Sequence, residues 1–325
     1  MNSKIVAITV GDTNGIGLDI LFKSIKEKKI GKFILFSNYK IIIKYIKKNK
    51  LKIDINIIKN NNNLLNNQNN KLNLYSYSSN SLEENTYKSL KFAYKFCKKN
   101  ICIGVITLPI RKDLIKTKIN KNFIGHTEYF QNIDKKKYSN MILFHEKIIV
   151  SPLTTHIEIK KISKVIKNKV FIYNQINNLV KTLKKDFNIK QPQIIISGLN
   201  PHAGENGKLG NEEIKIISPA VKKLKSKGIM IHGPYSADSL LINKNLEYYD
   251  CFIFIFHDQA LIPFKYISQF SGVNYTGNLS IIRTSPDHGT AYNLVDSKNI
   301  SDKSLLNCFK LIKEIYFNRK HADKT

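Results

Sequence analysis

The chain has 325 residues, 42% of them hydrophobic, and this length predicts an α/β protein of two domains rather than one small core. No apolar run approaches the ~20 residues of a membrane span, and the four cysteines form no CxxC pair, so we expect a cytoplasmic protein without a membrane partner. The net charge of +29 comes from lysines spread along the whole chain while arginine is rare, so we expect no dedicated nucleic-acid partner.

Strand-like and helical patterns alternate along the chain. Strands are predicted at residues 5–10, 33–37, 72–77, 101–108, 141–144, 148–153, 193–198, 229–233 and 251–256. The clearest helices are residues 211–227 and a helix that begins after Ser81, where Glu84 completes a capping box. This alternation predicts an α/β fold with mostly parallel sheets, and the Asn-rich residues 59–71 are predicted to be a surface loop.

The first glycine-rich segment, GDTNGIG at residues 11–17, follows a predicted strand directly. Its spacing is G-x-x-x-G-x-G, whereas the dinucleotide fingerprint is G-x-G-x-x-G with an acidic residue after a second strand. The segment alone therefore predicts a tight turn from a strand into a helix.

A second loop, GHTE at residues 125–128, precedes a helical pattern. Backbone N–H groups at a helix start, together with the Thr127 hydroxyl, can hold an anion. Thr127 can equally be a plain helix cap, so the residues alone leave both interpretations open.

Three histidines each follow a predicted strand: His156, His202 and His257. Ligand sites in open α/β sheets form just beyond the carboxyl ends of the strands, so three imidazoles there can converge on one divalent metal ion. For any one of them, a hydrogen-bonded core or loop histidine is the commoner case.

Residues 257–291 combine an imidazole, carboxylates, an amide and two cations, and they include Arg283. The chain contains only three arginines among its 53 Lys and Arg residues. An arginine placed here is suited to a bidentate clamp on an oxyanion, while the alternative is an exposed arginine in a loop.

Several segments, taken together and in order, resemble the signature series of the 4-hydroxythreonine-4-phosphate dehydrogenase family of pyridoxal phosphate biosynthesis. They are GDTNGIG, LPIRKDL, GHTE, TTHI, NPHAGENG, HDQALIPFKY, GVN and RTSPDHGTA, and they extend from about residue 4 to about residue 296. The resemblance implies a two-domain α/β/α fold like that of the isocitrate and isopropylmalate dehydrogenases. We expect one domain to comprise residues 1–130 plus 262–325. The other, residues 131–261, would carry the metal ligands and dimer contacts.

The family's functional residues can be carried over by motif. The metal ligands are His156, His202 and His257, one of them from the partner subunit of a homodimer with a shared active site. The substrate contacts are His126, Thr127, Lys265, Asn274 and Arg283, and the candidates for proton transfer are Asp238, Asp258 and water. The nucleotide-binding turn contains Asp287, His288, Gly289 and Thr290. The metal is expected to be zinc, with magnesium, manganese or cobalt as alternatives.

The implied reaction is the oxidation of 4-phosphohydroxy-L-threonine by NAD, with NADP as the alternative, to a β-keto acid. Loss of CO2 then yields 3-amino-2-oxopropyl phosphate. The first turn departs from the family's GDPAGIGPE at Thr13, Asn14, Leu18 and Asp19. Two other functions stay open: a dehydrogenase of a sugar-acid 4-phosphate of the threonate or erythronate type, and a non-catalytic basic protein that binds phosphate or nucleic acid.

Overall fold

The computed structural model describes residues 4–58, 71–295, 297 and 300–322, which form two compact units. Unit 1 comprises Met1–Asp134 and Leu279–Tyr316, and unit 2 comprises Lys135–Asn278 and Phe317–Thr325. The segment 59–70, most of the predicted Asn-rich loop, lies outside the described residues.

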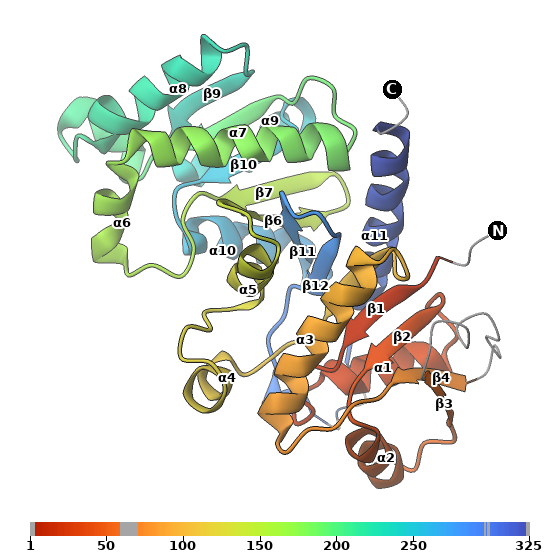
Figure 1. The fold of residues 1–325 in the computed structure, drawn as a ribbon. Coiled ribbons are helices and arrows are strands. Elements are labelled where there is room, and N and C mark those ends of the chain that lie inside the picture. The colour runs from red at the N-terminus through yellow and green to blue at the C-terminus, as the bar shows by residue number, and fades with distance from the viewer. Residues whose placement is uncertain (1–3, 59–70, 296, 298–299, 323–325) are drawn as a thin grey trace. The chain divides into compact units, whose positions relative to one another are not determined.

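The described strands of unit 1 form a parallel sheet. Their order is β3 (Asp54–Ile58), β4 (Lys71–Tyr75), β2 (Phe33–Phe36), β1 (Val6–Thr9), β5 (Gly104–Thr107) and β12 (Arg283–Pro286). The accompanying helices are α1 (Gly17–Lys26), α2 (Tyr39–Lys48), α3 (Leu82–Lys98), α4 (Lys112–Lys118), α5 (His126–Ile133) and most of α11 (Lys303–Ala322) (Figure 1). The strand β1 is completely buried, as expected for a parallel strand, and α3 packs against β1, β2 and β5.

Unit 2 has a mixed sheet with helices beside it (Figure 1). Its strand order is β11 (Val273–Gly277), β6 (Asn140–His145), β7 (Ile148–Pro152), β10 (Cys251–Phe254), β8 (Ile194–Ser197) and β9 (Ile231–Tyr235). Strand β6 is antiparallel to β11 and β7, whereas β10 is parallel to β7 and β8, and β8 is parallel to β9. The helices are α6 (Ile159–Ile166), α7 (Lys169–Asp186), α8 (Ser218–Lys225), α9 (Asn243–Tyr248) and α10 (His257–Ser268). The predicted mostly parallel α/β class is confirmed.

Each predicted strand overlaps an observed one, but β3, β11 and β12 were not predicted because their sequences are short and partly polar. The predicted helix 211–227 is also corrected. It consists of a π-helical turn, η3 (Glu213–Ile217), followed by α8. The wider turn changes the face that is buried, so Ile214 is 52% exposed and Ile216 takes the inner position.

The division into units differs from the expected domain boundary at residue 262. Helix α10 packs against β7 and β10, and β11 pairs with β6, so the chain stays in unit 2 until Asn278. Residues 317–322 also group with unit 2 rather than with unit 1.

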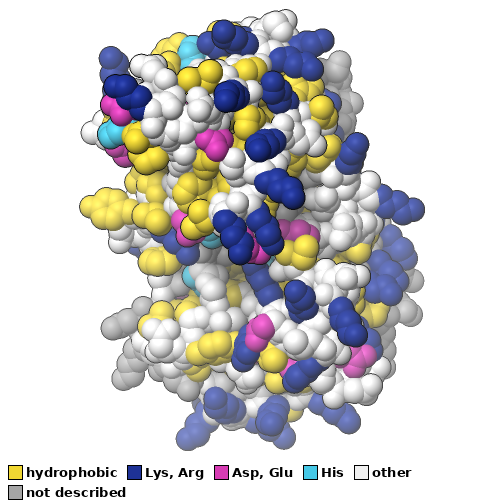
Figure 2. Space-filling model, turned by 90° about the vertical axis from the view of Figure 1, so that its left-hand side faces the viewer, with side chains coloured by type: hydrophobic (Ala, Val, Ile, Leu, Met, Phe, Trp, Pro, Cys, Tyr) yellow, Lys and Arg dark blue, Asp and Glu magenta, His cyan; other side chains and the backbone are white. Residues whose placement is uncertain are grey.

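No helix in the described part of the chain is long and apolar enough to cross a membrane. Lysine and arginine side chains are scattered over the face drawn in Figure 2 rather than gathered in one patch. This distribution fits the view that the positive charge is a general property of the composition.

A buried ion pair fixes the end of α11 within unit 2. The Arg319 guanidinium donates to Asp186 at the end of α7, with Nε–Oδ1 at 2.6 Å and Nη2–Oδ2 at 3.0 Å. The Tyr275 hydroxyl of β11 donates to the same carboxylate, whose side chain is only 2% exposed. The terminal turn of α11 is therefore held by a charge pair that is shielded from water.

Replacing Arg319 with methionine should strongly destabilise the protein, because it leaves the Asp186 carboxylate buried without its cation. The expected loss is about 3–5 kcal/mol in the free energy of unfolding, measured by urea denaturation. Lys310→Met, at an exposed position of the same helix, should cost no more than about 0.5 kcal/mol. Adding Asp186→Asn to Arg319→Met should recover part of the loss; a single variant as stable as the control would contradict the account.

Candidate active site

Unit 1 contains a cluster of charged and polar side chains that we name the cationic pocket: Thr107, Lys112, His126, Glu128 and Arg283. Strand β12 is the parallel neighbour of β5, and Arg283 pairs with Val105, two residues before β5 ends at Thr107. Its side chain is 1% exposed, and its Nε and Nη2 atoms donate to Thr107 Oγ1 at 3.1 and 2.6 Å. The alternative of an exposed loop arginine is therefore wrong.

The pocket holds an excess of positive potential. Burial lowers the pKa of Arg283 to about 10. Burial, and then the charges of Arg283 and Lys112, lower the pKa of His126 well below its usual value. The pKa of Lys112 is lowered by burial and by Arg283, while the Glu128 carboxylate raises it. The positive charges of such side chains repel one another and are poorly solvated. A bound anion offsets both effects, so the cluster is suited to binding an anion.

Gly125 brings two members of the pocket together at the start of α5. A Cβ atom at this position would lie 2.9 Å from Glu128 Oε2 and 3.5 Å from Lys112 Cε. His126 and Thr127 are the first residues of α5, and His126 Nε2 is buried with no hydrogen-bond partner among the described residues. The helix start and this nitrogen both face an environment suited to a phosphate or carboxylate group.

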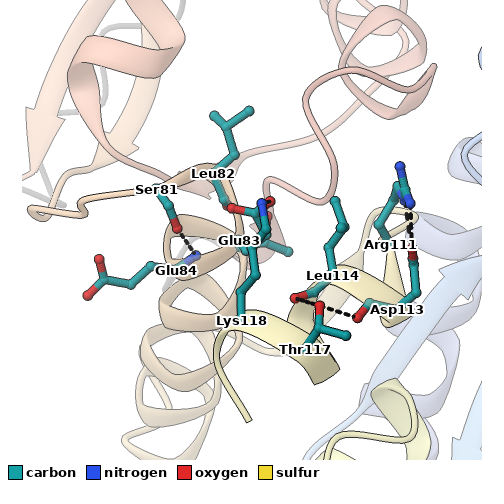
Figure 3. Close-up of polar contacts among 10 residues, drawn as sticks. Ser81, Leu82, Glu83, Glu84, Arg111, Asp113, Leu114, Thr117 and Lys118 are labelled. Carbon is teal, nitrogen blue, oxygen red and sulfur yellow. Dashed lines mark hydrogen bonds and ion pairs between the residues drawn. The ribbon is translucent and has the colours of Figure 1, made fainter. Parts of the chain in front are cut away.

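Helix α4 positions Lys112, and Figure 3 shows how α4 is tied to the start of α3. Lys118 Nζ lies 2.7 Å from Glu83 Oε1, and the Ser81 hydroxyl accepts a hydrogen bond from the Glu84 backbone N–H at 3.0 Å. The predicted helix start at Ser81 is thus confirmed. Sequence reasoning missed Thr107, Lys112 and Glu128. Their signal was position: Thr107 lies near the end of the predicted strand 101–108, Lys112 lies just beyond that strand, and Glu128 lies within GHTE.

The first glycine-rich segment is the tight turn between β1 and α1 that its spacing predicts, and the 287–291 turn packs on it. The Ile16 backbone N–H donates to Thr290 O at 3.0 Å. A Cβ atom at Gly15 would lie 2.7 Å from the same oxygen, so a side chain there would separate the two turns. The Tyr292 hydroxyl also donates to Asp12. Of the predicted nucleotide residues, Asp287 donates its backbone N–H to Ser304 Oγ at 3.2 Å, and His288 Nδ1 lies 3.0 Å from Gly289 O.

Unit 2 brings two of the three predicted metal ligands together. His156 follows β7 and His257 begins α10 directly after β10, and these strands are parallel neighbours. Their ring centroids are 5.7 Å apart, and both line a cavity of ≈ 160 Å³ together with Asp258. Asp258 Oδ1 lies 2.7 Å from His257 Nδ1, a contact that orients the ring and leaves Nε2 for another ligand.

His202 lies apart from this pair in the same chain. It belongs to η2 (Pro201–Gly207), where residues 202–206 all have positive φ angles, and its side chain is exposed. Among the described residues, no group of three or more His, Cys, Asp and Glu side chains is arranged to hold a metal ion. The described part of one chain therefore brings together two of the three histidines.

The remaining predicted residues of unit 2 occupy separate elements. Lys265 lies on α10, with Nζ 5.3 Å from the centroid of the Phe270 ring. Asn274 lies in β11, and its Oδ1 is buried with no hydrogen-bond partner among the described residues. Asp238 is exposed in the short η4 turn (Ala237–Ser239).

Comparisons with known proteins give a consistent result. The family described as "Pyridoxal phosphate biosynthetic protein PdxA" matches residues 29–312. The chain is 35% identical, over 92% of its length and 94% of the relative's, to a 4-hydroxythreonine-4-phosphate dehydrogenase of Sulfurihydrogenibium sp.. It is 30% identical, over 90% and 93%, to a D-threonate 4-phosphate dehydrogenase of Pectobacterium atrosepticum. A crystal structure of 4-hydroxythreonine-4-phosphate dehydrogenase from Klebsiella pneumoniae matches with a TM-score of 0.82 at 26% identity, covering 97% of this chain and 100% of that chain.

The lowered pKa of His126 predicts a pH dependence of stability. Below about pH 6.5 this histidine becomes protonated in the unfolded chain but stays neutral in the folded chain. Stability should therefore fall as the pH drops below that value, by up to about 1.4 kcal/mol per pH unit. His126→Gln should make the slope of unfolding free energy against pH shallower between about pH 5 and 6.5. His321→Gln, at an exposed position of α11, serves as the control; equal slopes in both variants would show that His126 titrates freely in the folded protein.

Proposed function

The chain belongs to the PdxA family of pyridoxal phosphate biosynthesis, and on this premise we propose that it catalyses the NAD(P)-dependent oxidation of 4-phosphohydroxy-L-threonine. The observation that carries the proposal is the cationic pocket of unit 1, which suits the phosphate of a small substrate. The product is a β-keto acid, which loses CO2 to give 3-amino-2-oxopropyl phosphate.

The cationic pocket binds the substrate phosphate in this proposal. Arg283 offers a planar fork of N–H groups, and its contact with Thr107 fixes the plane of the guanidinium. Lys112 adds a second charge, while neutral His126 and the first N–H groups of α5 supply hydrogen bonds. Thr127, Lys265 and Asn274 keep the substrate-binding roles that the motifs imply. A phosphate held by several groups orients the carbon that reacts.

The pair His156 and His257 fits a divalent metal ion, since imidazoles at this separation can share one ion and Asp258 orients His257. A bound ion would supply Lewis acidity to a substrate oxygen. We propose zinc, with magnesium, manganese or cobalt as alternatives. In the oxidation, a hydride leaves the secondary carbon for the nicotinamide ring, and the hydroxyl proton passes to a base. Because Asp258 is engaged with His257, Asp238 or water is the better candidate for this base.

We propose a homodimer in which His202 reaches the metal pair of the other subunit. Helix α10 carries Ile262 and Tyr266, four residues apart and 71% and 80% exposed, and Phe270, just after the end of the helix, is 54% exposed. These exposed apolar side chains, on and just after the helix that begins with His257, suit burial against a second copy of the chain. The four cysteines are buried and free, which fits a reducing cytoplasm.

The proposal is tested by measuring NAD and NADP reduction with 4-phosphohydroxy-L-threonine and with threonate 4-phosphate. We expect the amino substrate to be oxidised with the higher kcat/KM. Preference for threonate 4-phosphate would replace the proposal with the sugar-acid alternative. That alternative is the activity named for the Pectobacterium atrosepticum relative, a D-threonate 4-phosphate dehydrogenase. Binding of both phosphates without dinucleotide reduction would identify a non-catalytic binding protein.

The variant Arg283→Lys keeps the charge of the cationic pocket but removes the planar pair of guanidinium N–H donors. A charge-assisted hydrogen bond contributes roughly 1.5–3 kcal/mol, so kcat/KM should fall by about 10- to 100-fold with the phosphorylated substrate. The loss should shrink with the dephosphorylated analogue, which lacks the partner group. Lys116→Arg, at an exposed position of α4, should leave kinetics unchanged. A loss that appears only in the KM for the dinucleotide would reassign Arg283 to nucleotide binding.

The shared metal site predicts a specific pattern of complementation between inactive variants. Mixed dimers of His156→Ala and His202→Ala contain one intact site, so random exchange should restore about a quarter of the wild-type activity. Mixing His156→Ala with His257→Ala should restore none, because both ligands come from the same chain. Recovery in the second mixture and not in the first would place His257, rather than His202, across the interface.

A further inference from the structure

A cavity of unit 1, of ≈ 210 Å³, opens beside the first glycine-rich turn. We name it the α2 cavity. Its lining residues include Thr13, Asn14 and Gly15 of the turn, Asp19 of α1, and Lys44, Tyr45 and Lys48 of α2. It is separate from the cationic pocket, with which it shares no residue.

Two ammonium groups of this cavity are placed to act together. Lys44 and Lys48 are four residues apart on α2, so their side chains project from the same face of the helix. Neither forms a salt bridge or hydrogen bond with another residue in the described part of the chain. Two such cations side by side are suited to one phosphate group.

The cavity lining also includes a hydrogen-bond acceptor and an aromatic ring. The Tyr45 hydroxyl donates to Asp19 Oδ1, and the Tyr45 ring stacks on Phe22 with centroids 5.2 Å apart. Asp19 Oδ2 is buried and has no hydrogen-bond partner among the described residues. A ligand with a hydroxyl or amino donor and a nearby phosphate would satisfy this arrangement, and a ribose phosphate linked to a purine has both.

The position of the cavity connects it to the dinucleotide. Val295, which follows the predicted nucleotide turn, lines the cavity together with Gly15, the residue that packs on Thr290. A dinucleotide that follows these two joined turns would bring its adenosine end to the α2 cavity. In dinucleotide sites, a cation near the adenosine ribose accommodates a 2′-phosphate.

We infer that the α2 cavity binds the adenosine 2′-phosphate of NADP, with the phosphate between Lys44 and Lys48, and thereby makes NADP the preferred oxidant. This inference rests on the proposed function for the identity of the oxidant. Asp19 receives a hydrogen bond from the ribose or the purine amino group. The wall formed by Thr13, Asn14 and Gly15 holds the sugar.

The test uses isothermal titration of the full chain, at physiological salt, with 2′,5′-ADP, its isomer 3′,5′-ADP, and 5′-AMP. Wild-type protein should bind 2′,5′-ADP about 10- to 100-fold more tightly than 5′-AMP, and more tightly than the isomer of equal charge. The variant Lys44→Gln/Lys48→Gln should lose that advantage while binding of 5′-AMP stays the same. Lys47→Gln, on the same helix but outside the cavity, is the matched control.

Equal binding of the three nucleotides by the wild-type protein would overturn the inference, as would the same loss in the Lys47 control. The result is independent of the proposed reaction, since none of these nucleotides contains nicotinamide and no substrate is present. Oxidation of the phosphorylated substrate with NAD alone would leave the proposed function intact and reject the NADP preference. A clear advantage of 2′,5′-ADP without any substrate oxidation would support the cavity and reject the reaction.

Discussion

The burial of the Arg283 guanidinium is the constraint on which the chemistry of unit 1 depends. A cation that is 1% exposed loses most of its hydration, and here it is placed beside Lys112 and His126 rather than opposite several carboxylates. The fold tolerates this because Thr107 accepts two hydrogen bonds and Glu128 supplies an opposing charge. The arrangement is costly for stability and favourable for binding an anion.

The parallel sheet explains how these groups come together. Strand β12 pairs with β5 in a register that places Arg283 beside Val105, and the chain leaving β5 continues into α4 and then α5. The starts of both helices therefore lie beyond the carboxyl end of one strand, where α/β proteins bind their ligands. The same rule acts in unit 2, where the ends of β7 and β10 bring His156 next to His257.

The sequence predicted the fold where hydrophobic runs were long, and it failed where buried residues were polar. Strand β12 has the sequence RTSP, which has no strand-like pattern, although all four residues are buried. Lys112 could not be singled out from composition in a chain with 53 Lys and Arg residues. The convergence of His156 and His257 follows from their neighbouring strands. The separation of His202 could not be predicted, because the left-handed turn after β8 is not evident from NPHAGENG.

The most direct test of this account is the ¹⁵N NMR titration of the His126 imidazole, assigned with His126→Gln. Without ligand, the ring should stay neutral from about pH 5.5 to 8, because burial and the charges of Arg283 and Lys112 oppose its protonation. Added inorganic phosphate should shift its ring nitrogen signals, because the anion binds beside it. An imidazole that titrates near pH 6.5 and does not respond to phosphate would contradict the central claim that unit 1 contains a cationic phosphate site.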